Sequence, residues 1–270
     1  MTLSDVRRRL TDAGIGDADA EARLLFSHVS GLPAHRLIGG DPVCDDPRLN
    51  ELLQKRLARV PLAYLLGETA FFRETYRVTP DVLIPRPDTE RLVEEAIARV
   101  PRGARIADLC CGSGCIGIST LASRPDLTCD AIDLSPAAVA LTRENAKRNG
   151  VSSRLSATCA DLFALPAEIS GYGAILSNPP YIARAVIPTL SPEVRSEPLS
   201  ALDGGADGLA FYREIARRLP SLLIPGGIAL LEIGYDQADA VARIFSDEGF
   251  SATILPDYAG NPRVAVLSRV

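Results

Sequence analysis

The sequence predicts an α/β fold: a doubly wound, mostly parallel seven-stranded sheet with a C-terminal antiparallel hairpin, preceded by a small helical N-terminal domain. From residue 105 onward, apolar and β-branched runs alternate with segments of helix length, which is typical of a parallel sheet covered on both faces. The last two strand-like runs are separated only by residues 257–262, a connection too short for a crossover helix, so they should pair antiparallel.

The part of the chain before the sheet divides into two regions. Residues 1–60 predict a helical bundle, because apolar residues recur at helical spacing, as at Val6 and Leu10. Aromatic and β-branched residues then follow, broken by Gly67 and Pro80, and predict a hairpin-like connector over residues 62–85. A helix should run from there to about Arg99. The expected domains are therefore 1–60, a connector at 61–85, and 86–270.

The sheet itself is expected to contain seven strands whose ends are marked by turn residues. They are predicted near residues 106–109, 128–133, 155–158, 174–177, 227–233, 251–255 and 263–267. One intervening helix has clear ends, since Ser135 can cap it, Pro136 suits its first position and Gly150 can terminate it.

Composition excludes several classes of function. The net charge of −5 argues against a surface built to bind nucleic acid, and no apolar run approaches the ~18 residues of a membrane span. The start of the chain lacks the apolar stretch of a signal peptide, so we expect a cytoplasmic protein. Six cysteines without Cys-x-x-Cys pairs predict reduced, buried thiols, and two histidines near the N-terminus argue against a metal site.

A glycine-rich loop follows the first predicted strand of the sheet. Gly112 and Gly114 would allow a close approach of the backbone to a ligand, and the next helix offers free N–H groups to an anion. The spacing to Gly117 also matches the dinucleotide fingerprint, and Asp133 could accept hydrogen bonds from ribose hydroxyls of either ligand. The loop alone leaves S-adenosylmethionine, a dinucleotide and a purely structural turn open.

Two acidic residues favour a cofactor that contains an amino acid. Asp108 heads the loop, where it suits an ammonium group and would repel a pyrophosphate, although it could instead fix its own loop through backbone N–H groups. Asp161 and Leu162 follow the third strand, where they could bind an adenine ring, or form a helix cap followed by a core residue.

The tetrapeptide Asn178-Pro179-Pro180-Tyr181 follows an apolar strand, at the sheet edge where open parallel sheets bind ligands. A planar amide or aromatic amine nitrogen is a poor nucleophile because its lone pair is delocalised. An enzyme that methylates it therefore needs two acceptors that hold both N–H bonds and leave the lone pair aimed at the methyl group. The side-chain oxygen of Asn178 and the carbonyl of Pro179 can accept them. The prolines stiffen the loop, and Tyr181 can stack on the flat acceptor. The alternative is an ordinary turn.

These residues resemble a known family, the class I methyltransferases with an N/D-P-P-Y motif, and within it the glutamine N5-methyltransferases of peptide chain release factors (PrmC/HemK). The resemblance extends to Val60-Pro61-Leu62-Ala63-Tyr64-Leu65-Leu66-Gly67, Val82-Leu83-Ile84-Pro85-Arg86-Pro87-Asp88-Thr89-Glu90, Glu197-Pro198 with Ala201-Leu202, Gly204-Gly205-Ala206-Asp207-Gly208-Leu209, and Glu232-Ile233-Gly234 with Gln237.

The resemblance implies a fold, a cofactor and a partner. S-adenosyl-L-methionine would lie against Asp108, the loop Cys110-Cys111-Gly112-Ser113-Gly114, Asp133, Asp161, Leu162 and Asn178. Asn178, Pro179, Pro180 and Tyr181 would hold the glutamine of a Gly-Gly-Gln motif in a release factor, and the helical domain would help to recruit that partner. We expect a monomer without membrane or direct nucleic-acid partners.

The loop departs from the family at its start, where Gly-Thr-Gly-Ser-Gly is usual and Cys110-Cys111-Gly112-Ser113-Gly114 stands here. A side chain at position 110 predicts that this residue avoids positive φ, and the small size of cysteine predicts that the change is tolerated.

Alternative functions remain open on the sequence. The acceptor could be a glutamine of a ribosomal protein or an adenine in DNA, although the acidic balance disfavours the latter. A nicotinamide-dependent dehydrogenase would share the glycine pattern but leave the tetrapeptide without a role. A non-catalytic binding protein would leave the tetrapeptide unused as well.

Overall fold

The computed structural model describes residues 1–270, which form two compact units. The first contains Met1–Gly67 and Ser191–Ser196, and the second contains Glu68–Leu190 and Glu197–Val270. Among the helices, none combines the length and apolar character that a membrane crossing requires.

The first unit is helical, as the sequence predicts. Its elements are α1 (Leu3–Asp12), α2 (Ala18–Ser30), η1 (Ala34–Leu37), α3 (Pro47–Leu57), α4 (Leu62–Leu66) and α8 (Pro192–Arg195). A capping box starts α1, because the Thr2 hydroxyl accepts from the Asp5 N–H while the Asp5 carboxylate accepts from the Thr2 N–H. Glu193 of α8 forms ion pairs with Arg56 at 3.1 Å and Arg59 at 3.2 Å, which hold this short helix in the unit.

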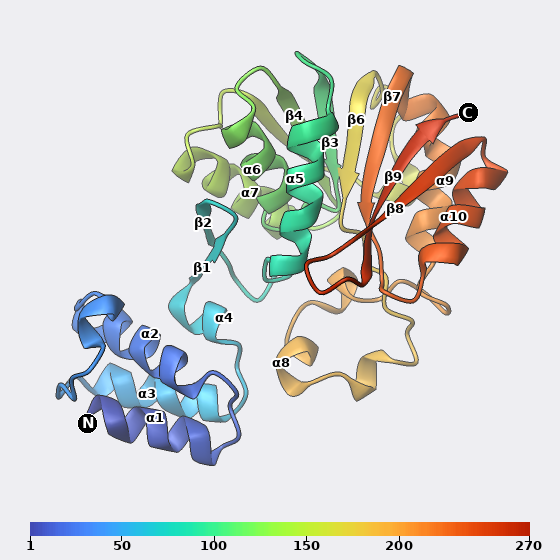
Figure 1. The fold of residues 1–270 in the computed structure, drawn as a ribbon. Helices are drawn as coiled ribbons and strands as arrows, with labels where there is room; N and C mark the ends of the chain where they lie inside the picture. The colour runs from blue at the N-terminus through green and yellow to red at the C-terminus, as the bar shows by residue number, and fades with distance from the viewer. The chain divides into compact units, whose positions relative to one another are not determined.

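The second unit is built on a seven-stranded sheet, shown in Figure 1. The strands are β3 (Arg105–Leu109), β4 (Thr128–Asp133), β5 (Leu155–Cys159), β6 (Tyr172–Ser177), β7 (Leu223–Glu232), β8 (Phe250–Pro256) and β9 (Pro262–Arg269). Their spatial order is β5-β4-β3-β6-β7-β9-β8, and every neighbouring pair is parallel except the two that involve β9. The predicted parallel sheet with a C-terminal antiparallel hairpin is therefore confirmed.

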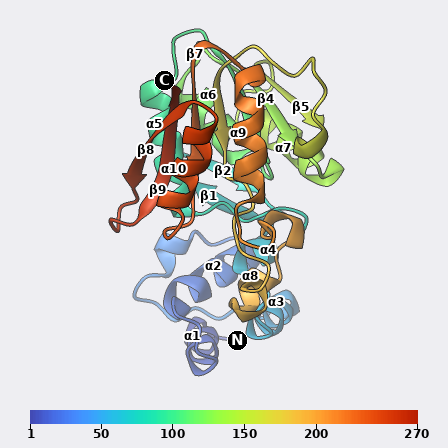
Figure 2. The same cartoon turned by 90° about the vertical axis from the view of Figure 1, so that its right-hand side faces the viewer.

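Helices cover both faces of this sheet (Figures 1 and 2). They are α5 (Glu90–Arg99), α6 (Cys115–Ser123) and α7 (Pro136–Arg148) on one face, and α9 (Ala210–Leu222) and α10 (Ala238–Asp247) on the other. Side chains alternate along each strand, so Ile106 of β3 packs in the core with α5 and α6 while Ala107 packs in the core with α9 and α10. The cap predicted at Ser135 is present, since its hydroxyl accepts from the Ala138 N–H at 3.3 Å.

The strand order reverses between β3 and β6, which places a crevice at the carboxyl ends of these two strands. Five short elements lie outside the sheet near its loops: β1 (Glu68–Phe71), β2 (Glu74–Arg77), η2 (Pro87–Thr89), η3 (Leu162–Ala164) and η5 (Leu199–Ala201). A further one, η4, spans Ile187–Thr189. The glycine-rich loop follows β3 and the proline-rich tetrapeptide follows β6, so both lie at this edge of the sheet.

Two sequence expectations need correction. The hairpin predicted over residues 62–85 is confined to β1 and β2, because Leu62–Leu66 forms the short helix α4, which ends where Gly67 adopts a φ of 75°. All six cysteines are unpaired, but Cys159 is exposed rather than buried and Cys110 is only partly buried.

Candidate active site

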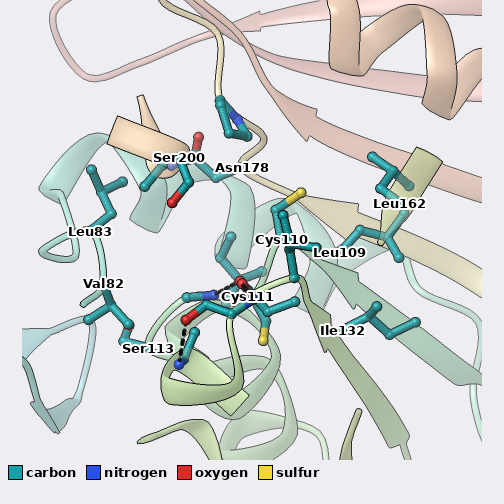
Figure 3. Close-up of a pocket in the computed structure, with 18 of the residues that line it drawn as sticks. Val82, Leu83, Leu109, Cys110, Cys111, Ser113, Ile132, Leu162, Asn178 and Ser200 are labelled. Atoms are coloured by element: carbon teal, nitrogen blue, oxygen red, sulfur yellow. Dashed lines mark hydrogen bonds between the residues drawn. The ribbon is translucent and has the colours of Figure 1, made fainter. Parts of the chain in front are cut away.

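The crevice at the carboxyl ends of the strands contains a cavity of about 460 Å³ (Figure 3). Its walls come from four loops that follow β3, β4, β5 and β6, from residues 81–86 and 200–201, and from Thr89 and Phe211. Figure 3 shows Asn178 and Ser200 close to each other at one end, Val82 and Leu83 on one side, and Leu109, Ile132 and Leu162 on the opposite side.

The loop after β3 begins with a strained residue. Cys110 adopts a φ of 58°, in the left-handed region, so the expectation that it avoids positive φ is wrong. The turn is held by a tertiary contact: the next residue, Cys111, donates its N–H to the Ile132 carbonyl of β4 at 3.1 Å, which fixes the backbone just after position 110. Both cysteines line the cavity, as does Ser113.

The glycines of this loop serve different purposes. Gly112 lines the cavity, and a side chain built there would meet nothing within 4 Å. A side chain at Gly114 would instead lie 2.8 Å from Thr142, and one at Gly117 would lie 2.9 Å from Cys129. Gly112 is therefore the glycine that opens the loop toward a ligand, whereas Gly114 and Gly117 allow close packing within the protein.

Two carboxyl groups support the loop. Asp133, at the end of β4, lines the cavity and accepts from the N–H groups of Gly112 at 2.8 Å and Ser135 at 2.9 Å. Asp108 is fully buried and does not line the cavity; one oxygen accepts from the Gly117 N–H at 2.9 Å, and the other has no hydrogen-bond partner. Burial raises the pKa of Asp108 to about 7 and also raises the pKa of Asp133.

The loop after β5 contributes one polar and three apolar residues to the cavity, Asp161 together with Ala160, Leu162 and Phe163. Asp161 caps η3 by accepting from the Phe163 N–H at 2.8 Å, and it lines the cavity together with buried Leu162. Phe163 packs edge-on against Phe211 of α9, with ring centroids 5.2 Å apart. The contribution of Phe211 could not be predicted from the sequence, because nothing local marks its position near this loop.

The tetrapeptide after β6 is only partly exposed to the cavity. Asn178 and Pro180 line it, whereas buried Pro179 and half-buried Tyr181 do not. The Asn178 side-chain NH2 donates to the Thr89 hydroxyl at 3.3 Å, and the Tyr181 hydroxyl donates to Glu232 at 3.4 Å. The ring of Tyr181 packs against the core beneath the sheet edge, and burial raises the pKa of its hydroxyl.

Further residues of the sequence motifs hold this tetrapeptide in place. Gln237 donates from its side-chain NH2 to the Tyr181 carbonyl at 3.0 Å. Side chains at Gly204 or Gly208 would collide with the backbone of Tyr181, at 2.8 Å for Gly204. Glycine at these two positions therefore lets a second segment pack directly on the tetrapeptide, a role that the sequence alone does not reveal.

The remaining wall comes from residues 81–86, which follow β2. Arg86 lines the cavity and forms an ion pair with buried Glu197, which also accepts from the Ile84 N–H at 3.2 Å. Glu197 thus fixes the segment opposite the glycine loop. Ser200 and Ala201, which lie shortly after Glu197 in the chain, complete the rim.

Comparisons with known proteins agree with this geometry. Residues 88–191 match the methyltransferase small domain, and residues 2–67 match the PrmC N-terminal domain. A release factor glutamine methyltransferase of Cereibacter sphaeroides is 44% identical, over 95% of this chain and 93% of that protein. The protein of the same name in Geobacter sulfurreducens is 40% identical, over 92% of this chain and 88% of that protein.

A solved methyltransferase structure from Pyrococcus furiosus shares the fold, with a TM-score of 0.56 and 16% identity over 79% of this chain and 97% of that one. The level of identity to the two bacterial relatives, maintained over nearly the whole length, shows that this chain belongs to the release factor glutamine methyltransferase family.

Proposed function

We propose that this protein transfers a methyl group from S-adenosyl-L-methionine to the side-chain nitrogen (N5) of the glutamine in the Gly-Gly-Gln motif of peptide chain release factors. The observation that carries the proposal is the orientation of Asn178 at the rim of the cavity. Its NH2 group is engaged by Thr89, which leaves its oxygen free to accept an N–H of an incoming amide.

The residues around the cavity fit this cofactor. The open backbone at Gly112, together with Cys110, Cys111 and Ser113, would hold its amino-acid end, and Asp133 would accept from its ribose hydroxyls. Asp161 and Leu162 would bind its adenine ring. Below the loop, the unpartnered oxygen of Asp108 is an acceptor in either protonation state, and when Asp108 ionises it adds negative potential that suits an ammonium group and disfavours the pyrophosphate of a dinucleotide.

The protein's own task in this reaction is orientation. When bound, S-adenosyl-L-methionine supplies a methyl group on a positively charged sulfur, which an amide nitrogen can accept. Asn178 through its side-chain oxygen, and Pro179 through its carbonyl, would accept the two N–H bonds and leave the nitrogen lone pair free to react. Since the positive charge makes the transfer favourable, the proton can leave to water afterwards and no general base is required.

The first unit, with Met1–Gly67 and Ser191–Ser196, is proposed to recruit the release factor. Because these substrates are translation factors, we also propose a cytoplasmic location. We further propose that the protein acts as a monomer without direct contact to nucleic acid. The net charge of −5 agrees with a protein partner rather than a DNA acceptor.

The test is methyl transfer followed by peptide mapping. The protein is incubated with methyl-labelled cofactor and a release factor, and the label should appear on the glutamine of the Gly-Gly-Gln peptide. A release factor with that glutamine replaced by alanine is the matched control. Label that persists in the control, or that appears only on a ribosomal protein or on DNA, would refute the proposed acceptor.

A further inference from the structure

A buried carboxyl group lies behind the tetrapeptide and has no part in the reaction described above. Glu232 ends β7 and is 1% exposed. Burying a carboxyl is costly unless hydrogen bonds hold it. Its two oxygens accept from the hydroxyls of Thr89 at 2.6 Å and Tyr181 at 3.4 Å. Glu232 therefore connects η2 with the loop that carries Asn178.

The direction of these hydrogen bonds determines how the Asn178 amide is turned. An ionised carboxylate only accepts, so the single hydroxyl proton of Thr89 must point to Glu232. The Thr89 oxygen then offers only lone pairs to Asn178, so Asn178 must present its NH2 group. The structure has this arrangement, with the Asn178 side-chain nitrogen 3.3 Å from the Thr89 hydroxyl oxygen. A flipped amide would bring two acceptors face to face, so the Asn178 oxygen is turned away from Thr89.

We propose that Thr89 and Glu232 are positioning residues, which hold the Asn178 amide with its oxygen toward the acceptor glutamine. The identity of that acceptor rests on the proposed function, whereas the amide orientation follows from hydrogen bonds within the protein. Thr89 borders the cavity and is 2% exposed, but while Glu232 is ionised the only Thr89 hydroxyl proton is committed to that carboxylate, so Thr89 acts through Asn178.

The charge state of Glu232 adds a pH dependence. This group faces Thr89 and Asp88 of η2, Tyr181 of the tetrapeptide loop and Arg263 of β9, and it also lies within electrostatic reach of Tyr212 of α9 and Cys115 of α6. Burial raises its pKa to about 7. A protonated Glu232 can donate to Thr89, which frees the hydroxyl proton and removes the constraint on Asn178. The transfer rate should therefore fall as the pH drops below about 7.

The kinetic test compares Thr89→Val, which keeps the shape of Thr89 but removes its hydroxyl, with Thr89→Ser, which keeps the hydroxyl and removes a methyl group. Thr89→Val should lower the single-turnover rate at saturating substrates by about tenfold, and Thr89→Ser should restore most of it. In an Asn178→Asp background a carboxylate faces the Thr89 lone pairs and has no amide orientation to lose, so Thr89→Val should leave the rate unchanged or raise it. An equal loss in both backgrounds would overturn the positioning role. Thr120→Val, which removes another buried hydroxyl, controls for general destabilisation.

A measurement without substrate separates this inference from the proposed function. In ¹⁵N NMR spectra, the side-chain NH2 signals of Asn178, identified by their loss in Asn178→Asp, should shift and broaden in Thr89→Val but not in Thr120→Val. Unchanged signals would overturn the positioning role even where the release factor is methylated. Perturbed signals in a protein that does not methylate the release factor would uphold the positioning role and refute only the proposed acceptor.

Discussion

Replacing Cys110 by glycine should make the protein more stable than replacing it by alanine. Cys110 holds a φ of 58°, which costs a residue with a side chain roughly 1–2 kcal/mol and costs glycine almost nothing. The greater freedom of glycine in the unfolded chain offsets about 0.4–1 kcal/mol of that gain. The Cys110→Gly variant should therefore exceed Cys110→Ala by about 0.5–1 kcal/mol in free energy of unfolding. Both variants lack the sulfur, so its lost packing cancels.

The adjacent cysteine is the matched control. Cys111 is buried, and its φ is not positive. At this position the glycine variant should be less stable than the alanine variant, by about 0.4–1 kcal/mol, because the greater freedom of glycine in the unfolded chain is not offset by any relief of backbone strain. Urea unfolding of the four variants measures both differences. A glycine that is less stable than alanine at position 110 as well would show that the loop does not hold the left-handed conformation.

Three further outcomes are expected. Asn178→Ala should remove most turnover and leave the cofactor dissociation constant within a small factor, which isothermal calorimetry and kinetics measure together; an equal loss of both would assign Asn178 to the cofactor instead. Gly208→Ala should destabilise the protein by on the order of 2 kcal/mol or more and lower kcat. Its new methyl group would collide with the Tyr181 carbonyl, and the φ of 75° at this position is strained for alanine. The pKa of Asp108 is raised to about 7, so its contribution to stability is present below about pH 4 and is lost as the pH rises through about 7. Asp108→Asn should flatten this decline in urea-unfolding free energy between pH 4.5 and 8, and an unchanged slope would contradict it.

The sheet could be predicted from the sequence because its strands are marked locally. Apolar runs such as residues 174–177 are bounded by turn residues, and the helix after Ser135 carries its own start and stop signals. The tetrapeptide could be placed at the sheet edge for the same reason, since it follows an apolar strand directly. Local sequence signals were therefore sufficient to predict both the sheet and the position of Asn178 at its edge.

What could not be predicted depends on contacts between segments that are distant in the sequence. The turn at Cys110 is held by a hydrogen bond from Cys111 to β4, and the need for glycine at position 114 follows from Thr142 of α7. The membership of Ser191–Ser196 in the helical unit depends on Glu193 and its two arginine partners. No pattern within a short window of sequence contains this information.

The proposed function gives a reason why so many residues from distant segments pack around the tetrapeptide. An amide nitrogen that needs no base reacts only if its N–H bonds are held in one direction, so the catalytic contribution must come from acceptors that are already fixed. Flexible acceptors would lose that orientation to conformational entropy. Prolines at 179 and 180, close backbone packing at Gly204 and Gly208, and the hydrogen bond from Gln237 all restrict the loop before any ligand binds. A loop preorganised in this way should keep its conformation when the cavity is filled, so its amide hydrogens, unlike those of the cavity rim at 199–201, should show the same exchange protection with and without cofactor.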